Sequence, residues 1–130
     1  MYKIQCGCGS TELTISNKPK VRGICHCEDC RDLLDVPFHA VNAWEKQYVE
    51  ISKGEDNLLE FQHPTLEMKR YICKDCGETL FNTNALDWRV VSHLLTQKNY
   101  DQVPEELVPD KHFYYGRRII DIGDDLPKYD

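Results

Sequence analysis

The sequence contains no long hydrophobic run and no excess of basic residues. No apolar stretch approaches the roughly 18 residues of a membrane-spanning helix, and the N-terminal segment MYKIQCGCGS lacks the apolar centre of a secretion signal. Acidic residues outnumber basic residues 22 to 16, for a net charge of −6, whereas nucleic acids and anionic membranes favour proteins rich in lysine and arginine. These absences predict a cytoplasmic protein whose partner is neither a nucleic acid nor a membrane.

A sustained helical stripe of apolar residues is also missing, and short segments typical of strands take its place. These segments are TELTI at 11–15, QYVEIS at 47–52, EMKRYI at 67–72, RVVSH at 89–93 and HFYY at 112–115. The stretch CEDCRDLL at 27–34 is expected to form one short helical turn. Because 130 residues are the length of one ordinary domain, the prediction is a single, mostly β domain over 1–130 with eight or more strands and at most one short helical turn.

Cysteine is abundant, with seven residues in the chain. An odd number cannot all pair within one chain, and the predicted compartment is reducing, so disulfides are not expected. Metal binding or catalysis is the better interpretation. The thiols fall into three groups: Cys6 and Cys8, then Cys25, Cys27 and Cys30, then Cys73 and Cys76.

Two thiol pairs far apart in the sequence are typical of a closed, four-cysteine structural zinc site. The pairs Cys6/Cys8 and Cys73/Cys76 fit this pattern, because glycines lie within or just after both of them and allow the tight turns that bring two thiolates onto one ion. The alternative is a set of four buried free thiols.

The remaining thiols, Cys25, Cys27 and Cys30, predict a zinc with three protein ligands and an open fourth position, which is typical of a catalytic metal. In an extended backbone Cys25 and Cys27 project to one face while His26 points away. Zinc fits better than an iron–sulfur cluster, since no ferredoxin spacing is present. A fourth ligand such as His26, Asp35 or a distant histidine would instead make the site structural, and other partitions of the seven thiols stay open.

Three thiolates would make a zinc ion a weak Lewis acid, poorly suited to generating hydroxide, but soft enough to accept a fourth sulfur. Chemistry at such a site favours a thiol substrate held as its nucleophilic thiolate. The predicted reaction is therefore the making or breaking of a carbon–sulfur bond, rather than hydrolysis.

The motifs resemble those of the glutathione-dependent formaldehyde-activating enzyme and centromere protein V family. They read CGCG, CHCEDCR, VPFHA, KGEDNLLEF, RYICKDCGETLF and DDLPKY, in order from Cys6 to Tyr129. The resemblance implies a twisted β fold of the mammalian-suppressor (Mss-like) type with two zinc ions per chain. It implies a structural zinc on Cys6, Cys8, Cys73 and Cys76, a catalytic zinc on Cys25, Cys27 and Cys30, and a carbon–sulfur lyase that joins a thiol such as glutathione to formaldehyde.

Several other residues are candidates for further roles. Asp35 and Val36 stand where similar sequences often have glycine and a small residue. The stretch RRIIDIG, directly before DDLP, lacks the tryptophan that similar sequences often have there. Asp35, Glu28 and Asp29 are candidates for the acid that protonates the adduct oxygen. Arg31 and Arg70 either contact the substrate, for example through a carboxylate, or form surface ion pairs. The competing function is a non-enzymatic, zinc-stabilised β scaffold that binds a protein partner.

Overall fold

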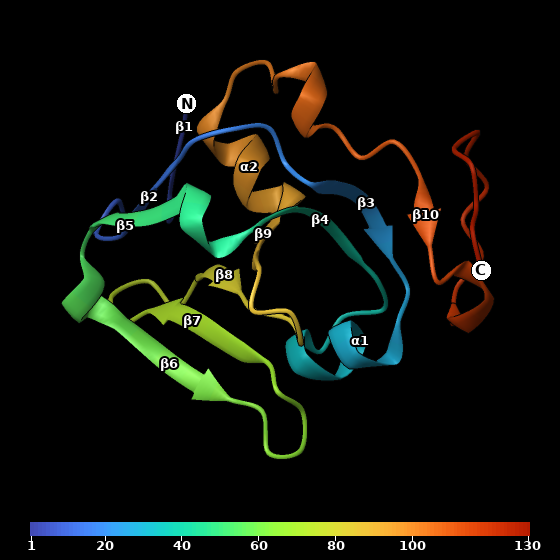
Figure 1. Cartoon of the computed structure of the whole chain (residues 1–130), viewed down its shortest axis with the longest axis horizontal. Coiled ribbons are helices and arrows are strands. Elements are labelled where there is room, and N and C mark those ends of the chain that lie inside the picture. Colours follow the sequence, from blue (N-terminus) through green and yellow to red (C-terminus); the bar gives the residue numbers. More distant parts are fainter.

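The computed structural model describes all 130 residues, and its strands form two sheets (Figure 1). The smaller sheet has the order β1 (Tyr2–Gln5), β2 (Glu12–Ile15), β5 (Val49–Lys53). The larger sheet has the order β10 (His112–Phe113), β3 (Val21–Cys25), β4 (His39–Trp44), β9 (Arg89–Ser92), β8 (Thr79–Asn82), β7 (Lys69–Cys73), β6 (Leu58–Gln62). Only the pairing of β10 with β3 is parallel.

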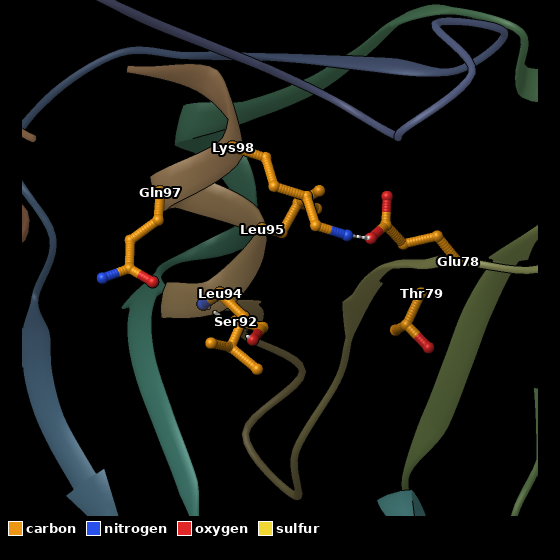
Figure 2. A pocket seen from close by; sticks show the side chains of 7 residues that line it. All are labelled: Glu78, Thr79, Ser92, Leu94, Leu95, Gln97 and Lys98. Atoms are coloured by element: carbon orange, nitrogen blue, oxygen red, sulfur yellow. Dashed lines mark hydrogen bonds and ion pairs between the residues drawn. The ribbon is translucent and has the colours of Figure 1, made fainter. Parts of the chain in front are cut away.

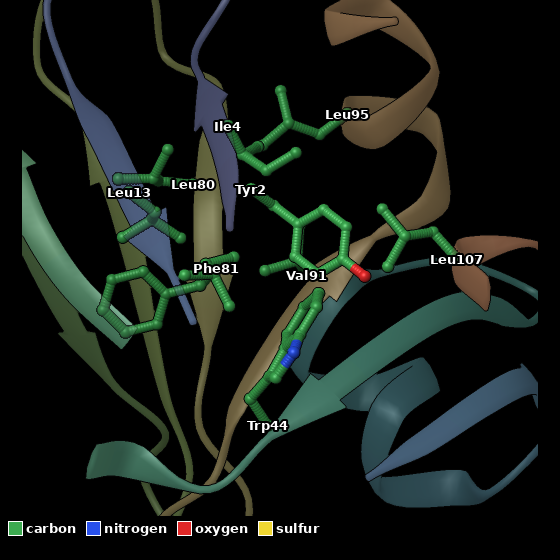
Figure 3. Packing of buried hydrophobic residues seen from close by; sticks show 10 residues of the cluster. Tyr2, Ile4, Leu13, Trp44, Leu80, Phe81, Val91, Leu95 and Leu107 are labelled. Atoms are coloured by element: carbon green, nitrogen blue, oxygen red, sulfur yellow. The ribbon is translucent and has the colours of Figure 1, made fainter. Parts of the chain in front are cut away.

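The alternation of buried and more exposed side chains along the strands builds the core. In β1 and β2 every second side chain is buried, so each strand presents one apolar face to the interior. Ten buried residues pack together there: Tyr2, Ile4, Leu13, Ile15, Trp44, Leu80, Phe81, Val91, Leu95 and Leu107 (Figure 3). They come from both sheets, from helix α2 (His93–Asn99) and from a 3₁₀ turn at Glu105–Leu107, so the core joins the two sheets.

The predicted mostly β class is confirmed, with ten strands and two α-helices, α1 (Glu28–Leu34) and α2. Three further 3₁₀ turns lie at Lys46–Tyr48, Glu55–Asn57 and Tyr115–Arg117. The expectation of at most one helical turn is wrong, because α2 is a second helix. It begins at His93, the last residue of the segment RVVSH that is typical of a strand. Ser92 ends β9 and caps α2 by accepting a hydrogen bond from the Leu94 amide, so one serine serves both elements.

Helix α2 was not predictable because it shows little amphipathic pattern. It has seven residues, of which only Leu95 and Thr96 are buried, while Leu94 is exposed. A helix this short gains its stability from tertiary packing rather than from its own propensity. No helix in the protein combines the length and the apolar character needed to cross a membrane.

Helix α1 lies in the connection between β3 and β4, and this connection positions one group of thiols. Cys27 is its N-cap and accepts a hydrogen bond at Sγ from the Cys30 amide at 3.4 Å. Asp35 ends the helix in the left-handed conformation, with a φ of 55°. The chain then enters β4, which pairs antiparallel with β3 from Cys25↔His39 to Val21↔Ala43.

Candidate metal centres

The structure brings together the four cysteines of the two outer pairs. Their sulfur atoms all lie within 4.8 Å of one another, although the two pairs are far apart in sequence. Cys8 Sγ is 3.7 Å from both Cys6 Sγ and Cys73 Sγ. Gly9 and Gly77 follow the two pairs with φ values of 77° and 76°, a left-handed conformation that glycine adopts without strain.

Zinc requires thiolate ligands, and the surroundings lower the pKa of Cys6 and Cys8, whereas burial raises the pKa of Cys73 to about 11. Burial opposes ionisation of the Cys6 thiol, but hydrogen bonds from Thr11, Cys73 and Cys8 outweigh it and lower the pKa of Cys6 to about 6. The Thr11 amide donates to Cys6 Sγ at 3.4 Å. Four mutually close sulfurs with an amide N–H directed at one of them suit a tetrahedral zinc ion.

A second group contains Cys25, Cys27 and Cys30, also within 4.8 Å of one another. Cys25 Sγ lies 3.2 Å from Cys27 Sγ and 3.6 Å from Cys30 Sγ. Hydrogen bonds from the Cys25 and Cys30 thiols, together with the amides of Cys30 and Asp29, hold the pKa of Cys27 down to about 2, and the same contacts raise the pKa of Cys25 to about 12 and that of Cys30 as well. The set is therefore suited to a soft metal ion, and no histidine or carboxylate belongs to it.

The residues considered as a fourth ligand lie elsewhere. His26 is fully buried, and its Nε2 is 2.9 Å from Nδ1 of His112. His112 Nε2 in turn lies 2.8 Å from Asp124, which ties the C-terminal segment to the CHC motif. Asp35 is exposed at the end of α1, where its conformation explains why similar sequences often have glycine. Neither His26 nor Asp35 joins the three thiols.

The acid candidates also lie in solvent. Glu28 and Asp29 are exposed in the first turn of α1, and Glu28 forms an ion pair with Arg117 at 3.2 Å. Neither carboxyl group belongs to the cluster of three thiols. These positions do not favour either residue as the acid.

Several buried polar atoms without hydrogen-bond partners belong to residues next to the three thiols in the sequence or in the strand register. Six such side-chain atoms occur in the protein, and three of them are His26 Nδ1, Arg31 Nε and His39 Nε2. His26 and Arg31 directly follow ligand candidates, and His39 is the cross-strand partner of Cys25. Sequence reasoning missed His39. The available signal was the pairing of the strands on either side of the CHCEDC motif.

Two surface hollows are prominent. One, of about 490 Å³, lies between α1, β6 and β7 and is lined by Asp32, Leu33, Phe61, His63, Pro64, Thr65, Arg70 and Ile72. Within it His63 Nε2 lies 2.6 Å from the Asp32 carboxylate. Arg70 donates through Nε to Thr79 Oγ1 at 2.7 Å and has no carboxylate partner, so it does not form the surface ion pair considered from the sequence.

Figure 2 shows the other hollow, of about 480 Å³, between α2 and the start of β8. Lys98 reaches across it to Glu78, and the exposed Leu94 forms part of its wall. Its lining contains no cysteine or histidine, so it offers no soft metal ligand.

Comparison with known proteins places this geometry in context. The family model described as glutathione-dependent formaldehyde-activating enzyme matches residues 1–117, a range that includes all seven cysteines. An uncharacterized lyase of Schizosaccharomyces pombe is 33% identical over 81 residues, which are 62% of this chain and 56% of that protein. The chain thus matches little more than half the length of that relative. A crystal structure of a Rhodobacter sphaeroides protein has a TM-score of 0.59 and 18% identity, covering 99% of this chain and 100% of that one, which indicates a shared fold.

Proposed function

This chain belongs to the glutathione-dependent formaldehyde-activating enzyme family, and on that premise we propose that it is a carbon–sulfur lyase acting at Cys25, Cys27 and Cys30. The sulfur of a thiol adds to an aldehyde carbon, and the thiol proton ends on the former carbonyl oxygen. In reverse, the same bond breaks and releases thiol and aldehyde. The observation that carries the proposal is the group of three close sulfurs without a fourth side chain.

The two cysteine groups would have different tasks. The group of Cys6, Cys8, Cys73 and Cys76 would hold a structural zinc that joins the N-terminal strands to the turn after β7. The group of three would hold the second zinc. Bound by three thiolates, this ion supplies a soft centre that favours a sulfur ligand over hydroxide. Partial exposure of Cys27 and Cys30 leaves this group open to a substrate.

The proposed substrate is an adduct of an aldehyde with glutathione or a related thiol. Helix α1 supports this class, because it contributes Cys30 to the thiol group and Asp32 and Leu33 to the wall of the hollow beside β6 and β7. The guanidinium of Arg70 in that hollow has no acidic partner and is suited to a substrate carboxylate.

The competing proposal, a non-enzymatic scaffold, requires a protein side chain that closes the second metal site. The three thiols have no such neighbour among the histidines and carboxylates, so this observation favours the enzyme. Metal content and X-ray absorption at the zinc edge would distinguish the two. The enzyme predicts two ions per chain and a non-protein donor at one of them.

The direct test compares Cys27→Ser with the wild type. Serine is a good N-cap, so it retains the cap of α1 while removing a soft ligand. We expect a folded variant with one zinc instead of two and at least a 100-fold slower equilibration of glutathione and formaldehyde with S-hydroxymethylglutathione, measured by NMR exchange. A variant that retains the wild-type rate would reject the catalytic assignment.

A further inference from the structure

We propose that His39 is a substrate-binding residue whose Nε2 accepts a hydrogen bond from the hydroxyl group of the thiol–aldehyde adduct held at Cys25, Cys27 and Cys30. This inference rests on the proposed function and adds to it the group that recognises the oxygen end of the substrate. The exposed carboxylates of Glu28, Asp29 and Asp35 do not provide such a group.

The strand register places His39 beside the thiols. Cys25 is the last residue of β3 and His39 the first residue of β4, and the two are direct partners in this antiparallel pair. Direct partners project to the same face of a sheet, with Cβ atoms roughly 5 Å apart. The intervening residues carry Cys27 and Cys30 on and before α1, so the His39 side chain lies at the base of the loop that holds the three sulfurs.

Burial and bonding leave one nitrogen of His39 without a partner. The residue is 8% exposed, and Nε2 is a buried polar atom with no hydrogen bond. A buried polar group without a partner costs free energy, and such groups in native proteins often form a hydrogen bond with a ligand or an ordered water molecule. Along the same sheet face, Val41 and Ala43 are apolar and offer no alternative donor or acceptor.

The side chain of Asn82 lies near the imidazole of His39. The Asn82 amide nitrogen donates to the Thr83 carbonyl at 3.1 Å, which leaves the amide oxygen to accept. In the proposed complex His39 is the tautomer with Nδ1–H, so that the unpartnered Nε2 carries the lone pair.

Burial also keeps the imidazole neutral. A charged imidazolium that is only 8% exposed would be poorly solvated, so the neutral ring is favoured. A neutral imidazole with its lone pair on Nε2 can accept a hydrogen bond from a hydroxyl but cannot donate one from that atom. The matching ligand is therefore a small alcohol attached to the sulfur, rather than a second carboxylate or a carbonyl.

The test measures hydroxyl recognition by isothermal titration calorimetry. The probes are the inert thioethers S-(2-hydroxyethyl)glutathione and S-propylglutathione, which differ in a terminal hydroxyl against a methyl group. We expect the zinc-loaded wild type to bind the hydroxyl compound about 5- to 10-fold more tightly, the range of one net hydrogen bond. His39→Leu should abolish that preference. His39→Gln, which can place an amide oxygen near the position of Nε2, should restore part of it.

Two further measurements do not depend on ligand affinity. Nitrogen-15 NMR of the wild type should show His39 protonated on Nδ1 and not on Nε2, so protonated Nε2 would overturn the proposal. Zinc content should stay at two per chain in His39→Leu. A folded His39→Leu protein with one zinc would make His39 a metal ligand and also overturn it.

The outcomes separate the two proposals. If the wild type binds both thioethers equally, the role of His39 is wrong while the lyase proposal stands. If the wild type binds neither thioether and does not accelerate adduct exchange, both proposals fail. If His39→Leu does not fold, the other three results test the proposal. It stands if the wild type binds the hydroxyl compound more tightly, if His39→Gln keeps part of that preference and if NMR places the proton on Nδ1. It fails if any of these results is absent.

Discussion

Replacing Cys76 by serine should destabilise the protein more than replacing Cys30, although each change removes one thiol. Cys76 is exposed, so serine there disturbs no buried packing and the effect reports on metal binding. The metal on the four-cysteine group would join residues that are 65 positions apart, such as Cys8 and Cys73. The three-thiol group spans only the five positions from Cys25 to Cys30.

The difference can be worked from the entropy of loop closure. A cross-link over 65 residues removes about 4 kcal/mol of conformational freedom from the unfolded chain, and one over five residues removes about 2 kcal/mol. A domain of this size has a total stability of about 5–15 kcal/mol, so a loss of about 4 kcal/mol is roughly a quarter or more of the total.

The assay is urea unfolding followed by circular dichroism, in a chelator concentration that leaves the wild type fully loaded with zinc. We expect the free energy of unfolding to fall by about 4 kcal/mol in Cys76→Ser and by about 2 kcal/mol in Cys30→Ser, with one zinc lost in each. Equal losses, or a larger loss in Cys30→Ser, would refute the assignment of the outer pairs as the structural site.

Two other predictions concern stability. Asp35→Gly should raise the free energy of unfolding by about 0.5–1 kcal/mol, because Asp35 has a φ of 55° that glycine adopts without strain. The control Asp35→Ala should lower the free energy of unfolding. A gain in both variants would contradict this reason. Burial, followed by the 2.8 Å hydrogen bond to Glu106, raises the pKa of Tyr2 to about 12. Because the folded pKa is higher than the unfolded value of about 10, this contribution to stability is complete below pH 10 and is lost as the pH rises toward 12. The difference in urea midpoint between wild type and Tyr2→Phe should therefore be constant from pH 7 to 9 and shrink at pH 11, and a difference independent of pH would contradict the shift.

Short-range pattern was enough to predict the mostly β class and the grouping of the thiols that the structure shows. Alternation in TELTI and EMKRYI indicates strands because the period of two follows from the pleat itself. Cysteines two or three positions apart, followed by glycine, come together through local turns whatever the rest of the chain does.

Tertiary structure alone decided which other side chains meet the thiols. His39 lies beside Cys25 because β3 and β4 pair in one register around a 13-residue connection, and a shift of one residue would turn His39 to the opposite face. The contact of His26 with His112 spans 86 positions and depends on the parallel pairing of β10 with β3. Helix α2 likewise depends on the core that Leu95 enters. These features follow from packing between distant segments, which no local pattern of residues encodes.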